Sequence, residues 1–278
     1  MGSFDLNAKD RSHLGESPVP TRRRRCEHGS VVRLPSQDYS SMLDSGETAL
    51  AALNTAGDSA GAGLARLYRA RFSSTEIAKK DRVWAILCDD FFSRFVSPGD
   101  RVLEIAAGYC EFINHINGRE KFAYDVNPDT VAHASNGVKV VQGDCRDMSG
   151  LPSAYFDVAF ASNFFEHLES KHDMDLVLAQ TRERLRPGGR LLVLQPNIRY
   201  LGARYWDFYD HITPLTHLSL REGLVKNGFE VELLIPKFLP YSFKSRFPTA
   251  GWMVRLYLRI RPAQWLLGKQ MFAVAKRT

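Results

Sequence analysis

Cysteine is scarce in this chain, and long apolar runs are missing. Only four cysteines stand among 278 residues, and they lack both the spacing of metal ligands and the density of a disulfide framework. No apolar run approaches the roughly 20 residues that span a bilayer, and the first residues lack the apolar stretch of a signal peptide. These absences exclude disulfide-rich secreted proteins and membrane-spanning proteins. We therefore expect a cytoplasmic protein with free thiols.

Acidic residues are missing from the end of the chain. No Asp or Glu follows Glu232, whereas nine Lys and Arg residues follow Pro236, more than the formal net charge of +6 of the whole chain. Because charge of this kind informs association rather than fold, we expect either an anionic partner here, such as a membrane surface, or only a solvated basic edge. Nucleic acid is not expected as a partner, and the oligomeric state is left open.

Composition divides the chain into two parts. Residues 1–60 are rich in Ser, Gly, Ala and Pro, contain the run Arg22–Arg25 and show no sustained period, so we expect a largely disordered basic arm. With 44% hydrophobic content, the chain can bury one substantial core. Helical spacing of apolar residues predicts a helical lead-in over 61–98, followed by the rest of a single domain that ends at residue 278.

From Arg101 onward, short apolar runs alternate with segments of helix length, a pattern typical of a parallel α/β sheet. Seven strands are predicted, over Arg101–Ile105, Lys121–Tyr124, Val138–Gln142, Phe156–Ala161, Arg190–Leu194, Glu230–Ile235 and Met271–Ala275. Helices are predicted over Glu111–Asn117, Asp129–Ala134, Lys171–Leu185 and Ser219–Lys226, with a sharp turn at Pro187–Gly189.

Candidate cofactor residues follow the first three strands. The first strand runs into Ala106–Cys110, where small residues let the backbone approach a ligand at the carboxyl ends of parallel strands. Asp125 ends the second strand, about 20 residues further on, where a carboxylate can accept the hydroxyls of a ribose. Asp144 and Cys145 follow the third strand and could read an adenine edge. Each Asp alone could be a turn or helix cap, but three features in register favour a cofactor site.

The run from Arg101 to Asn197 resembles the class I S-adenosylmethionine-dependent methyltransferases of the broad type 11 group. Their successive signatures are matched by Val102–Gly108, Tyr124–Asn127, Gly143–Asp144, Phe156–Asn163 and Leu185–Leu191. The resemblance implies a Rossmann-like α/β fold with a seven-stranded sheet of order 3-2-1-4-5-7-6, whose last strand is antiparallel, and S-adenosylmethionine as cofactor. The cofactor-binding residues that it implies are Glu104, Ala106 and Gly108 on the methionine side, Asp125 with Val126 at the ribose, Asp144 with Cys145 at the adenine, and Asn163 in the cofactor wall.

Two residues of the loop depart from the family's pattern. The family usually has glycine where Ala106 and Cys110 stand, and if Ala106 needs a positive φ, alanine costs on the order of 1 kcal/mol. This departure keeps open a nonenzymatic module that binds the cofactor. Cys110 is interpreted as a packing residue. A nicotinamide oxidoreductase is disfavoured, because G-x-G-x-x-G and a catalytic Tyr-x-x-x-Lys are both missing.

Methyl transfer to a hydroxyl needs a group that removes its proton. The preferred candidate base is His211, which stands in an aromatic-rich stretch after the fifth strand with Asp210 beside it to orient the ring. His167 is the second candidate, and His217 is the third.

A metal is not expected from the sequence. Asn163–His167 resembles the Glu-x-x-Glu-His metal motif of ubiquinone-pathway and small-RNA 2′-O-methyltransferases, but Asn163 replaces the first Glu. Because an amide binds a hard cation more weakly than a carboxylate does, the sequence predicts no metal.

A segment over about 236–269 separates the sixth and seventh strands, where this fold often has a tight hairpin. It combines basic residues with the apolar stripe Trp252, Met253, Leu256, Tyr257 and Ile260, which suits either a membrane interface or a lid or dimer helix.

A further resemblance concerns the methyl acceptor. Methyltransferases of bacterial surface-glycan pathways are resembled by three stretches of this chain, Asn197–Tyr200, Tyr205–Asp207 and Leu239–Tyr241. We therefore expect O-methylation of a sugar or lipid-linked glycan, in the cytoplasm or at the inner face of the membrane. The alternative acceptor is a small aromatic or polyketide-like metabolite.

Overall fold

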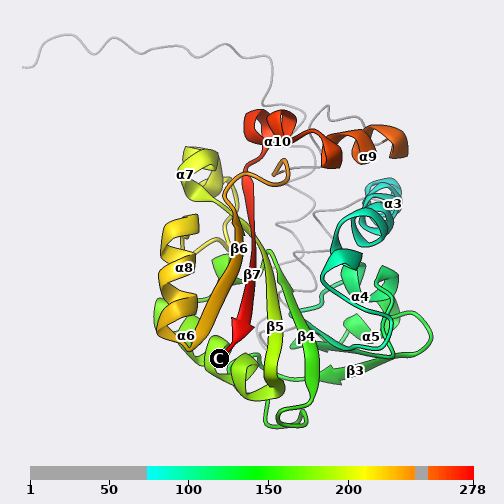
Figure 1. Cartoon of the computed structure of the whole chain (residues 1–278), viewed down its shortest axis with the longest axis vertical. Helices are drawn as coiled ribbons and strands as arrows, with labels where there is room; N and C mark the ends of the chain where they lie inside the picture. The colour runs from blue at the N-terminus through cyan, green and yellow to red at the C-terminus, as the bar shows by residue number, and fades with distance from the viewer. Residues whose placement is uncertain (1–73, 242–249) are drawn as a thin grey trace, which may run out of the picture. The chain divides into compact units, whose positions relative to one another are not determined.

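The computed structural model describes residues 74–241 and 250–278. The basic arm predicted over 1–60, the start of the helical lead-in and residues 242–249 of the insertion lie outside the described residues. In the described part, helices cover both faces of a central sheet (Figure 1).

Seven strands form this sheet in the order β3-β2-β1-β4-β5-β7-β6. The strands β1 to β5 pair in parallel, whereas β7 lies antiparallel between β5 and β6. Their bounds are β1 (Arg101–Ile105), β2 (Glu120–Asp125), β3 (Val138–Gln142), β4 (Phe156–Ser162), β5 (Leu185–Pro196), β6 (Phe229–Ile235) and β7 (Gln270–Arg277). The predicted fold class, sheet order and antiparallel last strand are thus confirmed.

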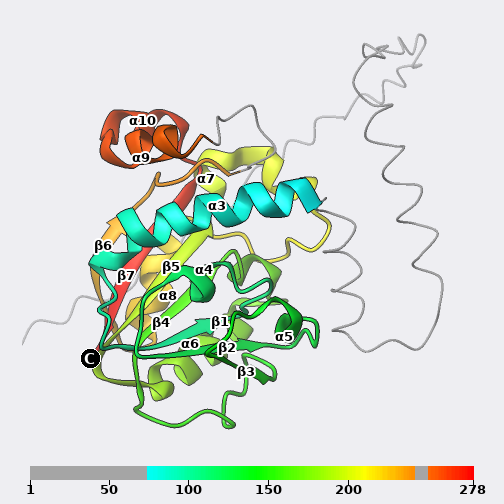
Figure 2. The same ribbon diagram turned by 90° about the vertical axis from the view of Figure 1, so that its right-hand side faces the viewer.

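The helices divide the apolar side chains into two cores. The helices α3 (Ser74–Asp90), α4 (Glu111–His115) and α5 (Thr130–His133) lie on one face, with the short helix η2 (Phe92–Arg94), and α6 (Lys171–Arg184) and α8 (His217–Lys226) lie on the other (Figures 1 and 2). Successive residues of a strand point to opposite faces, so Val102 packs in the first core and Leu103 in the second. Both side chains are fully buried, which explains why the strands read as continuous apolar runs.

The strand β5 begins earlier than predicted. Pro187–Gly189, which the sequence predicts as a turn between helix and strand, lies inside β5, where the pairing with β4 shifts in register between Phe156 and Val158. Gly188 has φ +75°, a left-handed conformation that glycine adopts at little cost, and this lets the strand bulge rather than end.

The insertion between β6 and β7 contains two helices, α9 (Gly251–Arg259) and α10 (Arg261–Leu267). Its apolar stripe divides between two surfaces, because Tyr257 is buried and donates from its hydroxyl to the carbonyl of Phe238 at 2.7 Å, while Trp252 and Leu256 are exposed. In the part of the chain that the structure describes, no helix has the length and apolar character needed to span a bilayer.

Candidate functional site

The candidate site lies at the carboxyl ends of the parallel strands. The loop 106–110 follows β1, Asp125 closes β2, and Asn163 follows β4. Three short helical elements continue the chain at this edge: η3 (Phe165–His167) after β4, then α7 (Ile198–Leu201) and η4 (Gly202–Asp207) after β5. Because ligands of open α/β sheets bind beyond the carboxyl ends of the strands, this edge is where a cofactor and an acceptor would meet.

The loop after β1 takes left-handed backbone conformations at three positions. Ala106, Gly108 and Cys110 have φ values of 52°, 50° and 58°. A Cβ at Gly108 would meet no heavy atom of the described residues within 4 Å, so the loop leaves room there for a ligand to approach the backbone. Ala106 thus has the positive φ in which alanine is less stable than glycine. Cys110 is fully buried and burial raises its pKa to about 12, in agreement with a packing role.

Asp125 connects this loop to the end of β2. One oxygen of its carboxylate accepts the backbone N–H of Gly108 at 2.7 Å, and the other accepts the backbone N–H of Asn127 at 2.7 Å. Burial raises the pKa of Asp125, and these backbone donors partly oppose the rise. The backbone of Val126 is a third donor to this carboxylate. Because a carboxylate has about four acceptor positions, Asp125 can still accept a hydrogen bond from a ribose hydroxyl.

Glu104 lies one residue before the end of β1 and is almost completely buried. Its carboxylate accepts the backbone N–H of Ile113 at 2.9 Å, which attaches the first turns of α4 to the strand. Burial raises the pKa of Glu104 well above its ordinary value. The structure therefore gives Glu104 a clear part in positioning the loop and helix, whereas its contact with the methionine side of the cofactor stays a prediction.

The residues predicted at the adenine and ribose differ in exposure. The Asp144 carboxylate is held by Arg146 at 2.6 Å, and this hydrogen bond lowers the pKa of Asp144. Cys145 is buried, and burial raises the pKa of its thiol, so only its backbone could face a ligand. Val126, next to Asp125, is 41% exposed, and its contact with the cofactor stays a prediction.

Asn163 follows β4 with a φ of 46°. Its side-chain oxygen accepts a hydrogen bond from the amide of Gln270 at 2.9 Å, and its backbone N–H donates to the carbonyl of Leu194. The residue thus connects the ends of β4, β5 and β7. At this position Asn163 could line the cofactor site, and its contact with the cofactor stays a prediction.

The acceptor side contains a cluster that comes from two segments of the chain. Glu166 and His167 belong to η3, while Asp210 and His211 stand just after η4. The Nδ1 atom of His167 lies 3.0 Å from the backbone oxygen of Asp210 and 3.2 Å from its carboxylate. Asp210 therefore orients His167, whereas the sequence predicted that it orients its neighbour His211.

The ring of His211 is buried and stacks on Phe208, with ring centroids 5.0 Å apart. Its Nδ1 atom lies 2.9 Å from the carbonyl oxygen of Tyr205, and its ring centroid lies 5.2 Å from that of His167. Burial lowers the pKa of His167, but the Asp210 hydrogen bond and the nearby Glu166 outweigh burial and raise it. The rings of the two preferred candidate bases are thus in contact with each other.

His217, the third candidate, lies elsewhere. It begins α8, accepts from the side-chain amide of Asn197 at 3.1 Å and stacks on Tyr200. Burial lowers its pKa, with a smaller effect from Arg199. These contacts indicate a structural role at the start of the helix.

Sequence reasoning missed Gln195 and Gln270 as residues of the site, and it named Tyr241 only within the stretch Leu239–Tyr241. Gln195 donates to the Glu166 carboxylate at 2.5 Å, Gln270 holds Asn163, and the Tyr241 hydroxyl lies 3.4 Å from Nε2 of His211. Only Gln195 carried a signal, since it is a polar residue at the end of an otherwise apolar strand.

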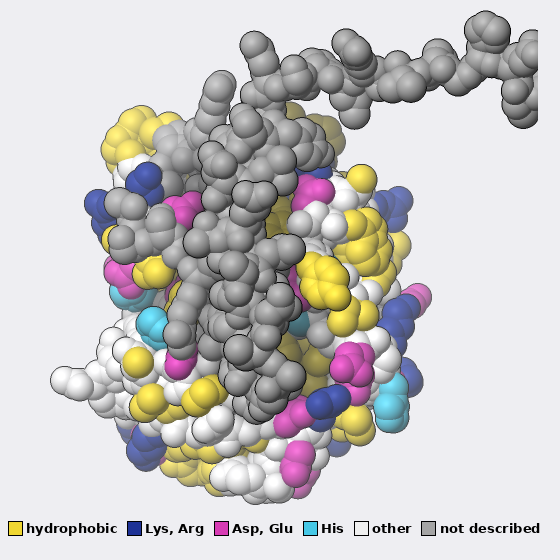
Figure 3. Space-filling model, turned by 180° about the vertical axis from the view of Figure 1, so that it is seen from behind, with side chains coloured by type: hydrophobic (Ala, Val, Ile, Leu, Met, Phe, Trp, Pro, Cys, Tyr) yellow, Lys and Arg dark blue, Asp and Glu magenta, His cyan; other side chains and the backbone are white. Residues whose placement is uncertain are grey.

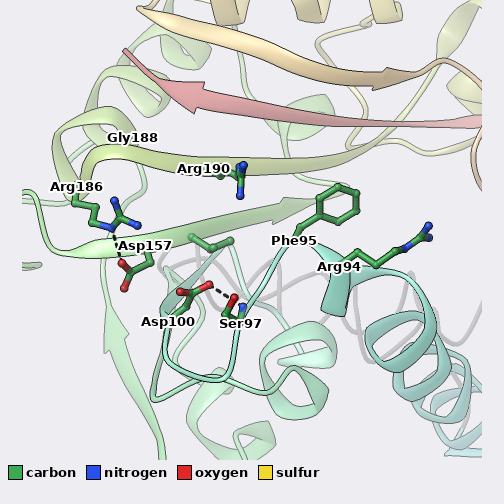
Figure 4. Close-up of a pocket in the computed structure, with 9 residues that line it drawn as sticks. Arg94, Phe95, Ser97, Asp100, Asp157, Arg186, Gly188 and Arg190 are labelled. Atoms are coloured by element: carbon green, nitrogen blue, oxygen red, sulfur yellow. Dashed lines mark hydrogen bonds and ion pairs between the residues drawn. The ribbon is translucent and has the colours of Figure 1, made fainter.

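A second pocket lies at the opposite edge of the sheet, at the amino ends of β1 and β4 (Figure 4). Its charged side chains are paired with neighbours, since Arg186 binds Asp157 at 2.5 Å and the Asp100 carboxylate accepts the backbone N–H of Ser97 at 2.8 Å. None of the predicted site residues lines it. We therefore assign it no part in the candidate site.

The sheet order, together with a loop held by an acidic residue at the end of β2, defines the class I methyltransferase fold, whose cofactor is S-adenosylmethionine. The family model described as "Methyltransferase domain" matches residues 78–234, more than half of the chain, and the chain belongs to this family. No curated protein matches the sequence.

Solved structures with the same fold are distant in sequence. A chain from the Haloferax volcanii complex that contains the Trm112 methyltransferase activator has a TM-score of 0.53 and 17% identity, and the match covers 72% of this chain and 92% of that chain. A SAM-dependent methyltransferase from Archaeoglobus fulgidus has a TM-score of 0.52 and 19% identity, with 71% and 94% covered. At these identities the likeness concerns the fold alone.

Proposed function

We propose that this protein transfers a methyl group from S-adenosylmethionine to a hydroxyl of a sugar or lipid-linked glycan. The observation that carries the proposal is the imidazole pair His167 and His211. The ring of His211 contacts Tyr205 and Phe208 of an aromatic loop whose Trp206 and Tyr209 are 55% and 99% exposed. Exposed rings of this kind stack on the apolar face of a sugar, and the carboxylate of Asp207 in the same loop can bind sugar hydroxyls.

The cofactor would be held by the residues at the ends of β1, β2 and β3. Gly108 offers space beside the backbone, and Asp125 offers acceptor positions for the ribose hydroxyls. When bound, S-adenosylmethionine supplies a methyl group whose bond to sulfur breaks, with the electron pair left on sulfur, as the acceptor oxygen bonds to the methyl carbon.

The acceptor hydroxyl must lose its proton in this reaction. We place that step at the cluster of Glu166, His167 and His211, with Asp210 holding the His167 ring. In the simplest form of the proposal, a neutral imidazole accepts the proton, His211 first and His167 second.

A lipid-linked acceptor is supported by the surface of α9 and α10, which lie at the end of the sheet where β5 ends and α7 begins (Figures 1 and 2). Seen from behind, hydrophobic side chains lie beside Lys and Arg side chains at the end of the molecule where α9 and α10 lie in Figure 1 (Figure 3). The exposed apolar side chains of these two helices are Trp252, Leu256, Ile260, Trp265, Leu266 and Leu267, and Arg259 and Arg261 are exposed beside them. Such a surface suits peripheral contact with an anionic membrane, so we propose that the protein works at its inner face.

The test is transfer of an isotopically labelled methyl group from S-adenosylmethionine to glycan and lipid extracts, followed by mass spectrometry. We expect label in a sugar or lipid-linked glycan with the wild type and none with Asp125→Ala. Label that enters only small aromatic or polyketide-like metabolites would replace the proposed acceptor. Cofactor binding without transfer to any extract would favour a nonenzymatic binding module.

A further inference from the structure

The cluster on the acceptor side has the composition of a metal site. Glu166, His167 and His211 each offer one ligand atom, and these atoms lie within 4.8 Å of one another. Glu166 and His211 are 1% and 6% exposed, whereas His167 is partly buried. This is the one such group that includes imidazoles and a carboxylate among residues 74–241 and 250–278.

The hydrogen bonds of both rings determine which nitrogen faces the cluster. Nδ1 of His211 lies 2.9 Å from a carbonyl oxygen of Tyr205, and Nδ1 of His167 lies 3.0 Å from that of Asp210. A carbonyl oxygen only accepts, so Nδ1 carries the hydrogen in each ring. A neutral ring then keeps its lone pair on Nε2. Outer partners of this kind orient most histidines that bind metals.

The carboxylate of Glu166 completes the set. Its Oε2 atom accepts from Gln195 at 2.5 Å, and its Oε1 atom lies 4.0 Å from Nε2 of His167. No Lys or Arg of the described ranges forms an ion pair with this buried carboxylate. Its potential positive partner among the described residues is the His167 ring, 4.0 Å away, if that ring is protonated; when the ring is neutral, a bound cation would supply the positive charge that a buried carboxylate needs.

We propose that Glu166, His167 and His211 bind one divalent transition-metal ion, of the class of Zn²⁺, Mn²⁺, Fe²⁺ or Co²⁺. Two imidazole nitrogens and one carboxylate oxygen are the ligands of open sites of these ions, in which a further position takes an oxygen ligand. Two nitrogen ligands disfavour Mg²⁺ and Ca²⁺, which prefer oxygen.

This proposal replaces the prediction of no metal, which considered only the stretch Asn163–His167. Asn163 is not one of the three proposed ligands, and its side-chain oxygen accepts from Gln270. The third ligand comes instead from His211, 44 residues beyond His167 in the sequence, a neighbour that tertiary packing supplies.

The catalytic use of the ion rests on the proposed function, but its binding does not. A cation with an open position lowers the pKa of a hydroxyl that coordinates it, and the hydroxyl proton then passes to water. In the metal-bound protein, His167 and His211 act as ligands, and neither needs to accept the proton.

The test measures metal binding directly. The full chain is stripped with a chelator, dialysed and titrated with Zn²⁺ by calorimetry, and with Co²⁺ by visible absorption, which reports nitrogen ligands. We expect one ion per chain. The ligand variants His211→Ala and Glu166→Gln should each weaken binding by at least the roughly 10 to 100-fold that loss of an outer partner costs. The matched control His217→Ala should bind the ion as the wild type does.

Because Glu166 is buried, a substitution there can also impair folding, so circular dichroism accompanies each variant. Asp210→Asn keeps the backbone acceptor of His167 and removes only the carboxylate, and it should weaken binding about 10 to 100-fold. Wild-type protein that binds no stoichiometric ion, or folded His211→Ala that binds as tightly as the wild type, would overturn the proposal. Titration with S-adenosylmethionine in parallel separates this outcome from failure of the proposed function, since the cofactor site and the metal site can be lost independently.

Discussion

The carboxylate of Asp125 accepts the backbone N–H of Gly108 at 2.7 Å, which joins the end of β2 to the loop after β1. The residue predicted to bind the ribose therefore also holds the loop that is predicted to contact the methionine side of the cofactor. A ligand on Asp125 and the shape of the loop are coupled through this single side chain.

Asp125→Ala should abolish measurable binding of S-adenosylmethionine. Two hydrogen bonds to a charged group contribute about 3–6 kcal/mol, so the dissociation constant should rise roughly 10² to 10⁴-fold in calorimetry. Asp125 is buried rather than exposed on a surface loop, so Asp125→Asn serves as a companion that keeps an acceptor for the Gly108 N–H. Wild-type affinity in a folded Asp125→Ala protein contradicts the ribose role.

Glu104 should make the stability of the protein depend on pH. Burial raises its folded-state pKa well above its ordinary value, so the folded state binds more protons than the unfolded state between these two pKa values. The favourable contribution is therefore complete below the unfolded-state pKa and is lost as pH rises through the folded-state pKa. Urea unfolding across this range should show wild-type stability falling relative to Glu104→Gln, which does not titrate. Parallel curves for the two proteins would contradict the assignment.

Ala106→Gly should stabilise the protein, because Ala106 has a φ of 52° that glycine adopts without strain. After the entropy of the unfolded chain is included, the gain should be about 0.5–1 kcal/mol, or about 1–4 °C in melting temperature. The control is Ala107→Gly at the next position, where φ is not positive and the same change should destabilise. Equal effects of the two substitutions would show that the left-handed conformation at Ala106 costs nothing.

His211→Gln should lower turnover about 10² to 10⁴-fold and leave the affinity for S-adenosylmethionine unchanged, because the ring lies on the acceptor side. His217→Gln is the matched control, since His217 contacts Asn197 and Tyr200 rather than the cluster. Steady-state rates and calorimetry distinguish the two effects. A loss below tenfold in His211→Gln would move the catalytic role to His167.

The surface of α9 and α10 should bind anionic vesicles at low salt and release them at high salt, because screening weakens charge attraction. Arg255 is paired with Asp90 at 3.1 Å, so the informative variant is Arg259→Glu with Arg261→Glu. Since each basic residue near such a membrane contributes about 1 kcal/mol, this double charge reversal should reduce co-sedimentation at least tenfold. A matched double variant on other exposed surfaces, Arg119→Glu with Arg221→Glu, should bind nearly as the wild type does. If the wild type ignores anionic vesicles at low salt, the lipid-linked acceptor loses its main support.

Much of the fold could be predicted from the sequence, because its signals are local. The strands β1 and β3 have the predicted bounds, since apolar runs between turn residues are readable over a few positions. The resemblance of the successive motifs also implied the sheet order, and it assigned Asp125 and Gly108 to one cofactor site, whereas the hydrogen bond between them was not predicted. The early start of β5 was not predicted, because a glycine with positive φ allows a bulge as readily as a turn.

The sequence by itself thus determined the class of fold, and it predicted the edge of the sheet at which the cofactor would bind. Only the tertiary structure determined which residues come together on the proposed acceptor side. It paired Asp210 with His167 and brought His211 to Glu166, across more than 40 residues and between two short helical segments. It also divided the stripe of α9 between a buried Tyr257 and an exposed Trp252. These contacts depend on how separate elements pack, so they cannot be predicted from the local spacing of residues.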